Sequence, residues 1–183
     1  MFDNEQLIAA FQTFLRYGFK KTSMEDLARA MGVSRQALYK RYGSKEAILD
    51  LVTRSLVEAS GDAALAALSA PETPLGDRLY QCLDQWTGQH VDPMRSSPHS
   101  GEVLAMTDHS PQSAIKQLEA RLRTQIEACL QQEAPRLNAA DVTYSLFIAS
   151  YGLLYKAEDH AEYESGMRRV LGAFGLDQAH LAH

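Results

Sequence analysis

Polar and basic side chains that can donate hydrogen bonds are concentrated between Ser34 and Tyr42. Ser34 is a residue type that caps helices, and the eight residues after it form one short predicted helix. Ser23 caps an earlier short helix, with Asp26 placed to close a capping box, and Gly32 ends that helix because a residue there commonly needs a positive φ. Two short helices joined by such a turn predict a helix-turn-helix, whose second helix lies in the major groove of DNA.

Apolar residues at helical spacing support the same arrangement. Met24, Leu27, Ala28 and Met31 recur at three, four and seven residues, which places them on one face of the first short helix. Ala28 is small enough to let the two helices cross closely, and Leu38 holds the second helix against the first. Double-stranded DNA is therefore the expected partner.

The charge of the chain is unevenly distributed. The formal net charge of the 183 residues is −5. Residues 1–55 hold nine Lys or Arg against six Asp or Glu, whereas residues 56–183 hold nine against seventeen. The basic excess coincides with the predicted DNA-reading helices, and phosphate would repel the remainder. An excess of this size is also compatible with ordinary surface scatter, so the helix-turn-helix pattern decides between the two interpretations.

Targeting signals and membrane spans are not expected. The first residues, MFDNEQ, lack the basic and apolar regions of a signal peptide. The longest apolar run, residues 146–155, is about half of the roughly 20 residues that a membrane span needs. Cys82 and Cys129 lie far apart on predicted helices and suit buried thiols in a reducing compartment. We expect a cytoplasmic protein without a membrane partner.

Helical periodicity extends along the chain, and no segment has a convincing strand pattern. The sequence predicts an all-α protein of about nine helices. Pro71 and Pro74 interrupt helical hydrogen bonding in residues 69–76 and mark a linker. We therefore expect a DNA-binding domain at 1–45, a connecting helix at 46–70 and a larger helical domain at 71–183. Residues 90–101 are predicted to form the longest loop.

Catalytic and metal-binding motifs are missing from the sequence. It contains no HExxH, no Glu-x-x-His, no G-x-S-x-G and no phosphate-binding glycine loop. Asp177, His180 and His183 are three residues apart, but this is weak evidence for a metal site. We expect no catalytic residue, no metal site and no cofactor.

Aromatic and sulfur-containing side chains in the larger domain are candidates for an effector pocket, because such pockets are apolar with a few polar groups. The candidates are Trp86, His90, Met106, Phe147 and Tyr151. Core packing is the alternative explanation for each of them.

The last two predicted helices are candidates for a dimer interface. Residues 141–156 are apolar over most of the helix circumference, and an apolar stripe runs from 163 to 174. Two such helices from each subunit can form a four-helix contact. The residues assigned to this interface are Phe147, Leu154, Met167, Val170, Leu171 and Phe174.

Residues 7–52 resemble the N-terminal domain of the tetracycline-repressor (TetR) family. The matching elements are GF, TSM, DLA, GVS, LY and SKE, in that order and at the family's spacing. The resemblance implies an all-helical homodimer in which three N-terminal helices bind DNA and a larger helical bundle dimerises and usually binds a small effector. Tyr42 departs from the pattern, because the family often has Phe there.

The helix-turn-helix geometry and the resemblance together assign the DNA contacts. The assigned residues are Thr22, Ser23, Ser34, Arg35, Gln36, Ala37, Tyr39, Lys40, Tyr42 and Lys45. Arg35 suits guanine, Gln36 suits adenine, and Ala37 suits a thymine methyl group. The resemblance assigns phosphate contacts to Tyr39 and Lys45. Thr22 and Ser23 lie at a helix N-terminus, which also suits a phosphate.

The function expected from these features is that of a ligand-responsive transcriptional regulator, more often a repressor, that acts as a homodimer on a pseudo-palindromic operator. One alternative is a regulator of the same type that a protein partner or a metal controls. A more distant alternative is a small helical enzyme whose N-terminal pattern is accidental.

Overall fold

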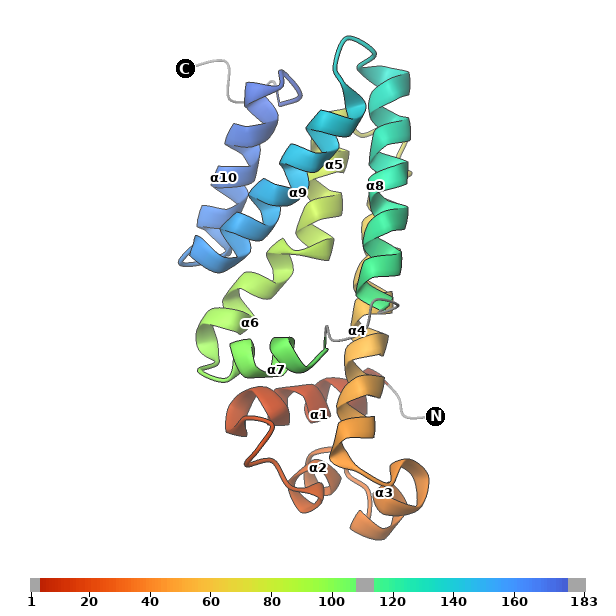
Figure 1. Cartoon of the computed structure of the whole chain (residues 1–183), viewed down its shortest axis with the longest axis vertical. Helices are drawn as coiled ribbons and strands as arrows, with labels where there is room; N and C mark the ends of the chain where they lie inside the picture. Colours follow the sequence, from red (N-terminus) through yellow and green to blue (C-terminus); the bar gives the residue numbers. More distant parts are fainter. Residues whose placement is uncertain (1–3, 108–113, 178–183) are drawn as a thin grey trace. The chain divides into compact units, whose positions relative to one another are not determined.

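The structure of the chain is a computed structural model, and it describes residues 4–107 and 114–177. Every regular element in these two ranges is helical, which confirms the predicted all-α class (Figure 1). The elements are α1 (Asn4–Tyr17), α2 (Met24–Ala30), α3 (Arg35–Tyr42), α4 (Lys45–Leu68), α5 (Leu75–Trp86), the 3₁₀ helix η1 (Gly88–His90), α6 (Val91–Ser96), α7 (Ser100–Thr107), α8 (Ala114–Glu133), α9 (Ala139–Lys156) and α10 (His160–Ala173).

The chain divides into two compact units. Unit 1 comprises Met1–Glu58 and Ser96–Ile115, and unit 2 comprises Ala59–Arg95 and Lys116–His183. Helix α4 begins in unit 1 and ends in unit 2. Helix α7 belongs to unit 1, although it follows the linker in the sequence.

The core of unit 1 is built by apolar faces of its five helices. Phe14 of α1 is fully buried and stacks on Phe19, with ring centroids 5.8 Å apart. Leu27 of α2, Leu38 of α3 and Ile48 of α4 are also fully buried. Because burying each such side chain contributes about 1.5–3 kcal/mol, these contacts fix the helix-turn-helix on α1 and α4.

Helix α7 is attached to the C-terminal end of α1 within unit 1. Ser97, just before α7, donates its hydroxyl hydrogen to the carbonyl oxygen of Leu15 at 2.6 Å. Val103 is fully buried in the same core as Phe14. The Ser97 hydroxyl therefore satisfies one of the carbonyl groups that a helix C-terminus leaves without a partner.

The prediction of a long loop at residues 90–101 is wrong. The segment instead continues from η1 into α6, and α7 begins at Ser100. Pro93 does not prevent a helix here. It lies in the first turn of α6, where a missing N–H breaks no helical hydrogen bond. The additional short helix raises the number of α-helices in the described ranges to ten, against about nine expected.

Unit 2 is a bundle in which α9 and α10 lie side by side and α10 also packs on α5 (Figure 1). Tyr163 of α10 is fully buried, and its hydroxyl group lies 2.8 Å from Ser150 Oγ and 3.1 Å from the carbonyl oxygen of Leu83. Leu122 and Leu146 supply further buried contacts from α8 and α9. The polar end of the large Tyr163 ring is thus satisfied, as a buried hydroxyl requires.

Candidate nucleic-acid interface

Helix α3 exposes almost all of its side chains. Leu38 is its only buried residue, and Tyr42 is half-buried. The exposed residues are Arg35, Gln36, Ala37, Tyr39, Lys40 and Arg41. Ser34 Oγ accepts the backbone N–H of Ala37 at 3.1 Å and so begins the helix, as predicted. The helix carries three cations and no carboxylate, so its open surface suits an anionic partner.

The N-terminus of α2 is closed by the predicted capping box. The backbone N–H of Ser23 donates to Asp26 Oδ2 at 3.1 Å, and Ser23 Oγ accepts the N–H of Asp26 at 3.2 Å. The hydrogen bonds from Ser23 hold the pKa of Asp26 below its ordinary value. Asp26 therefore stays ionised, and its carboxylate lies beside the position where a phosphate would meet this helix.

The turn between α2 and α3 fixes the angle of the two helices. Gly32 has a φ of 65°, which favours glycine, and the N–H of Val33 donates to the carbonyl oxygen of Ala28 at 3.0 Å. The side chain of Ala28 is only 3% exposed, so nothing larger fits at this crossing without movement. Both features agree with the sequence-based expectation.

The guanidinium group of Arg35 is held loosely at the surface. It lies 5.3 Å from the centroid of the Tyr39 ring and 4.0 Å from the carboxylate of Glu25 in α2. The side chains of Arg35 and Glu25 are each 58% exposed. Exposed ion pairs contribute little, so Arg35 can leave Glu25 for a base edge at small cost.

Thr22 is not placed as the sequence analysis expected. Its side chain is 2% exposed, and its hydroxyl donates to the carbonyl oxygen of Gly18 at 2.7 Å. The backbone N–H of Thr22 donates to the same oxygen at 3.1 Å. Thr22 thus closes the turn before α2, and its hydroxyl is not presented at the surface.

Lys45 also differs from the expectation of a free phosphate ligand. Its ammonium group donates to the carbonyl oxygens of Phe19, Lys20 and Thr22, at 2.8, 3.2 and 3.2 Å. No sequence signal could have revealed these partners, because three carbonyl groups converge only in the folded turn. Conversely, Arg41 is not among the assigned DNA contacts, yet it is exposed on α3 and lies 5.6 Å from the Tyr42 ring centroid. Its basic side chain on the predicted second helix was an available signal.

Three of the candidate effector residues of unit 2, Trp86, Phe147 and Tyr151, are joined by contacts. Trp86 Nε1 donates to Tyr151 Oη at 3.2 Å, and the Tyr151 hydroxyl donates to Glu119 Oε2 at 2.6 Å. Phe147 is fully buried 6.2 Å from the Tyr151 ring. His90 lies 3.5 Å from Ser60 Oγ, and burial lowers the pKa of this histidine. Met106 lies outside the residues whose side chains the structure describes.

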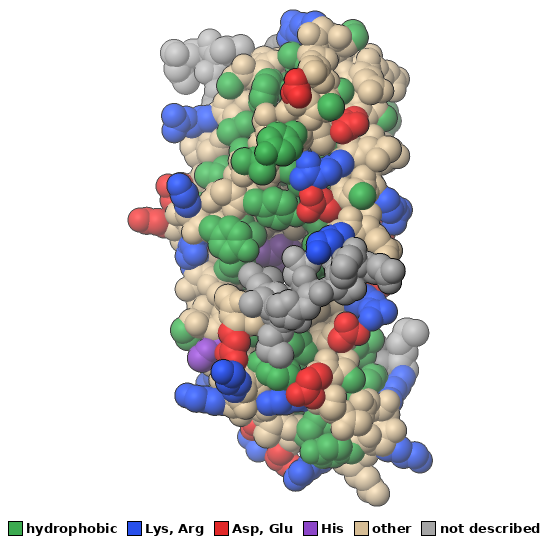
Figure 2. Space-filling model, in the orientation of Figure 1, with side chains coloured by type: hydrophobic (Ala, Val, Ile, Leu, Met, Phe, Trp, Pro, Cys, Tyr) green, Lys and Arg blue, Asp and Glu red, His purple; other side chains and the backbone are tan. Residues whose placement is uncertain are grey.

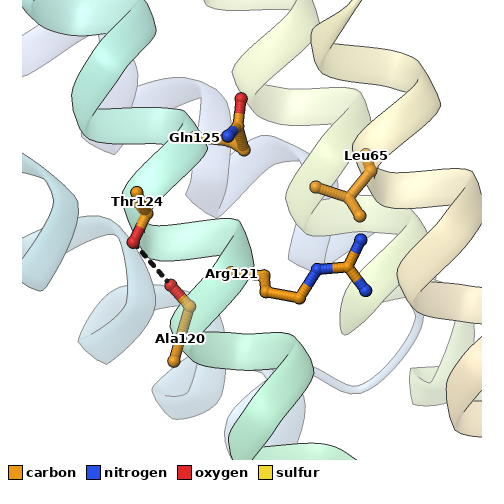
Figure 3. A pocket seen from close by; sticks show the side chains of 5 residues that line it. All are labelled: Leu65, Ala120, Arg121, Thr124 and Gln125. Atoms are coloured by element: carbon orange, nitrogen blue, oxygen red, sulfur yellow. Dashed lines mark hydrogen bonds between the residues drawn. The ribbon is translucent and has the colours of Figure 1, made fainter.

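Among the described residues, two cavities of unit 2 are lined by other side chains. The first, of about 340 Å³, is a groove between α4 and α8 into which Arg121 points (Figure 3). The second, of about 620 Å³, lies between the start of α5, the end of α8 and the residues after α10. Trp86, Phe147 and Tyr151 are thus placed together as packed neighbours, whereas the printed partner of His90 is Ser60.

Most of the residues assigned to the dimer interface are inside unit 2. Phe147, Leu154, Met167 and Leu171 are buried in the core of the chain, while Val170 and Phe174 are half-buried. The large apolar residues that α9 exposes are Tyr144, Ile148 and Tyr155, at 62, 54 and 64%. Figure 2 shows hydrophobic side chains gathered on the surface where α9 runs. The sequence could not separate the buried from the exposed residues of this helix, because α9 is apolar on both its inner and its outer face.

None of the helices in the described ranges combines the length and the hydropathy needed to cross a membrane.

Residues 7–52 match the family described as bacterial regulatory proteins, tetR family. A stretch of 62 residues is 36% identical to YezE, an uncharacterized HTH-type transcriptional regulator of Bacillus subtilis (strain 168). That match covers 34% of this chain and spans 32% of the length of the relative.

Solved structures resemble the chain over most of its length. One is the TetR family transcriptional regulator PfmR of Thermus thermophilus, with a TM-score of 0.62, 20% identity, and coverage of 91% of this chain and 97% of that chain. Another is a TetR transcription regulator of Haloarcula marismortui, with a TM-score of 0.66, 20% identity, and coverage of 96% of this chain and 95% of that chain. At these identities the likeness shows the fold alone.

Proposed function

We propose that the chain, whose residues 7–52 match the tetR family of bacterial regulatory proteins, is a DNA-binding transcriptional regulator. One observation carries the proposal. Helix α3 is the second helix of a helix-turn-helix, and it exposes donors and three cations while Leu38 and the half-buried Tyr42 pack against the core. A helix of this kind reads base edges in the major groove.

Within this proposal the exposed residues of α3 divide by role. Arg35 and Gln36, in the first turn, donate to base edges, and Ala37 contacts a thymine methyl group. Tyr39 and Lys40 contact phosphate and fix the register of the helix on the duplex. Ser23 and Ser34 act mainly as caps.

A selection of binding sites from random duplex DNA tests the proposed function. We expect an enriched pseudo-palindromic sequence, with affinity that falls steeply as the salt concentration rises. A matched duplex of scrambled sequence is the control. Equal affinity for the selected and the scrambled duplex would contradict sequence-specific regulation.

We further propose that the protein is a homodimer, with α9 against α9 of a second copy. In a two-fold, antiparallel crossing centred on Ile148, residues equally far before and after Ile148 face each other across the interface. Tyr144 and Gly152 are each four residues from Ile148, so Tyr144 lies opposite Gly152 of the second copy. Nothing lies within 4 Å of a side-chain carbon built on Gly152, so this exposed position leaves open space for the Tyr144 ring. The exposed face of α9 is thus complementary to itself.

The end residues of α9 support the same crossing. Asp141 is exposed seven residues before Ile148, and Tyr155 is exposed seven residues after it. The crossing brings the Asp141 carboxylate near the Tyr155 hydroxyl of the second copy, next to the exposed Lys156. A phenol and an ammonium are suitable partners for that carboxylate.

An effector in unit 2 completes the proposal. We place it against Trp86, His90, Phe147 and Tyr151, and we expect a mostly apolar or aromatic molecule that lowers DNA affinity. Because Trp86, Phe147 and Tyr151 pack together, the molecule has to open the Trp86–Tyr151 hydrogen bond and offer partners to both groups. A thermal-shift screen followed by a DNA-release assay tests the effector claim separately from DNA binding.

A further inference from the structure

The two cysteines of the chain carry free thiols and lie on different helices of unit 2. Cys82, in α5, is fully buried, whereas Cys129, in α8, is partly exposed. They are far apart in the sequence, so their spacing gives no reason to pair them. The packing of α5 and α8 supplies that reason.

Helices α5 and α8 run in opposite directions. The first residues of α5 and the last residue of α8 line the same cavity of about 620 Å³. At the other end, Trp86 is the last residue of α5 and donates to Tyr151. The Tyr151 hydroxyl donates in turn to Glu119, near the start of α8. The two helices are therefore antiparallel over the length of α5.

An ion pair fixes the register of these helices. Nη2 of Arg78 in α5 donates to Oε2 of Glu133 in α8 at 2.5 Å. Cys82 follows Arg78 by four residues, and Cys129 precedes Glu133 by four residues. Residues four apart lie on the same face of a helix. In antiparallel helices these equal steps place Cys82 and Cys129 at the same level, one turn away from the ion pair.

The electrostatics of the two thiols agree with this register. Burial, together with the charge of Cys129, raises the pKa of Cys82 to about 12. Burial also raises the pKa of Cys129, on which the charges of Arg78 and Glu133 act in opposite directions. Cys82 is thus sensitive to a charge on α8, and Cys129 is sensitive to a charge on α5.

We propose that Cys82 and Cys129 form a modification site at which hydrogen peroxide converts two thiols to a disulfide between α5 and α8. The thiolate of the more exposed Cys129 attacks the O–O bond, which gives a sulfenic acid and releases hydroxide. Hydroxide takes the proton of the Cys82 thiol. The Cys82 sulfur then attacks the Cys129 sulfur, and the sulfenic oxygen leaves as water after protonation. Two thiols and one peroxide therefore give one disulfide and two molecules of water.

The rate of this oxidation depends on pH. Burial disfavours both thiolates, so the two groups keep their protons near neutral pH. The thiolate is the nucleophile, and the rate should therefore rise about tenfold for each pH unit below the pKa of Cys129. The site accordingly responds to sustained rather than brief exposure to peroxide.

The test treats the reduced, full-length protein with hydrogen peroxide under native conditions and then blocks the remaining thiols with iodoacetamide. Trypsin separates the cysteines into the peptides 79–95 and 124–136. A disulfide joins these peptides into one species that dithiothreitol splits. We expect the two free thiols to be lost together, with the linked pair as the main product. Circular dichroism shows whether the oxidised protein stays helical.

A matched control moves one thiol around its helix. Cys129→Ala combined with Ala128→Cys keeps two cysteines, but it turns the second thiol by about 100° on α8 to an exposed position. This variant should give little or no linked peptide. Cys82→Ala should leave the Cys129 sulfenic acid without its partner, so that it proceeds to sulfinic acid or links two chains.

Three outcomes would overturn the proposal, and none of them depends on DNA binding. The first is oxidation of Cys129 alone in the wild type, with Cys82 still reduced. The second is an equal yield of linked peptide from the wild type and from the variant with the moved thiol. The third is a wild-type protein that keeps both thiols at pH 9 while peroxide consumes free cysteine in the same solution.

Discussion

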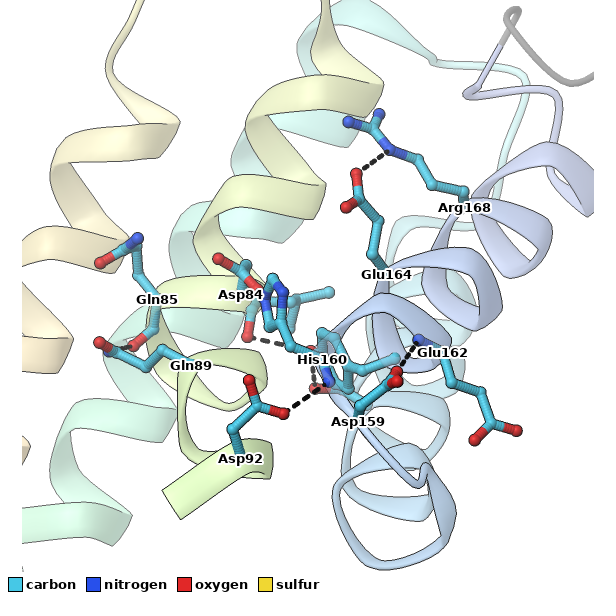
Figure 4. A network of polar contacts seen from close by, with 12 residues as sticks. Asp84, Gln85, Gln89, Asp92, Asp159, His160, Glu162, Glu164 and Arg168 are labelled. Carbon is cyan, nitrogen blue, oxygen red and sulfur yellow. Dashed lines mark hydrogen bonds and ion pairs between the residues drawn. The ribbon is translucent and has the colours of Figure 1, made fainter. Parts of the chain in front are cut away.

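The imidazole Nε2 of His160 lies 2.6 Å from Oδ1 of Asp84, and this contact joins the first residue of α10 to α5 (Figure 4). The backbone N–H of His160 also donates to Oδ1 of Asp92, in α6, at 2.9 Å. The hydrogen bond to Asp84 raises the pKa of His160, and the charges of Asp84, Asp92 and Glu164 add to the effect against partial burial. The start of α10 is therefore held more firmly when His160 carries a proton.

A pH dependence of stability follows from this pair. The folded-state pKa of His160 lies above the unfolded value of about 6.5, so the stabilisation is fully present below pH 6.5 and is lost as the pH rises through the folded-state pKa. We expect His160→Gln to lower the thermal midpoint at pH 6 and to have a smaller effect at pH 9. Asp84→Asn should remove the same pH dependence. A constant difference between His160→Gln and wild type across this range would contradict the prediction.

The helix caps allow a quantitative prediction for unit 1. Ser34→Ala removes the acceptor of the Ala37 N–H and should lower the free energy of unfolding by about 0.5–2 kcal/mol. Ser145→Ala is the control, because its hydroxyl only donates to a carbonyl oxygen within α9 that is already part of the helix. Urea denaturation measures both. Equal effects of the two substitutions would show that Ser34 is not an energetically important cap.

Base readout and phosphate contact are separable in α3. Arg35→Ala or Gln36→Ala should relax the preference at one base pair by about 1–3 kcal/mol. Tyr39→Phe removes only a hydroxyl and should weaken binding to all duplexes alike, because phosphate contacts carry no sequence information. Competition assays with single-base variants of the selected duplex measure the difference. A sequence preference altered by Tyr39→Phe, or left intact by Arg35→Ala, would reverse the assigned roles.

The exposed face of α9 gives a prediction that leaves the core of the chain untouched. Ile148→Glu should give a soluble, folded monomer, because Ile148 is 54% exposed. Phe147→Glu should instead unfold unit 2, because Phe147 is fully buried and a carboxylate there has no partner. Gly152→Trp fills the open space proposed to receive Tyr144 and should also give monomers. Sedimentation and circular dichroism distinguish these outcomes, and a stable dimer of Ile148→Glu would place the interface elsewhere.

The features that the sequence predicted correctly depend on residues that lie close together in the chain. Ser23 and Gly32 act on atoms a few residues away, so their types and spacing are sufficient. The partners of Lys45 lie 23 to 26 residues away, and their convergence depends on how α1 and α4 pack in the folded unit. In the same way, the helical pattern of α9 could not assign Phe147 to the core and Ile148 to the surface, because both are apolar.

The last prediction concerns the effector site. Tyr151 accepts the Trp86 N–H and donates to Glu119, so Tyr151→Phe should lower the free energy of unfolding by about 0.5–1.5 kcal/mol. Trp86 is the only tryptophan of the chain, and its fluorescence therefore reports on this contact directly. A compound that stabilises the wild type and changes Trp86 emission should lose at least part of both effects in Tyr151→Phe. Tyr144→Phe, on the exposed face of α9, should keep both. Identical binding to Tyr151→Phe with unchanged Trp86 emission would place the effector outside this network, and the two cavities of unit 2 would then be the next sites to test.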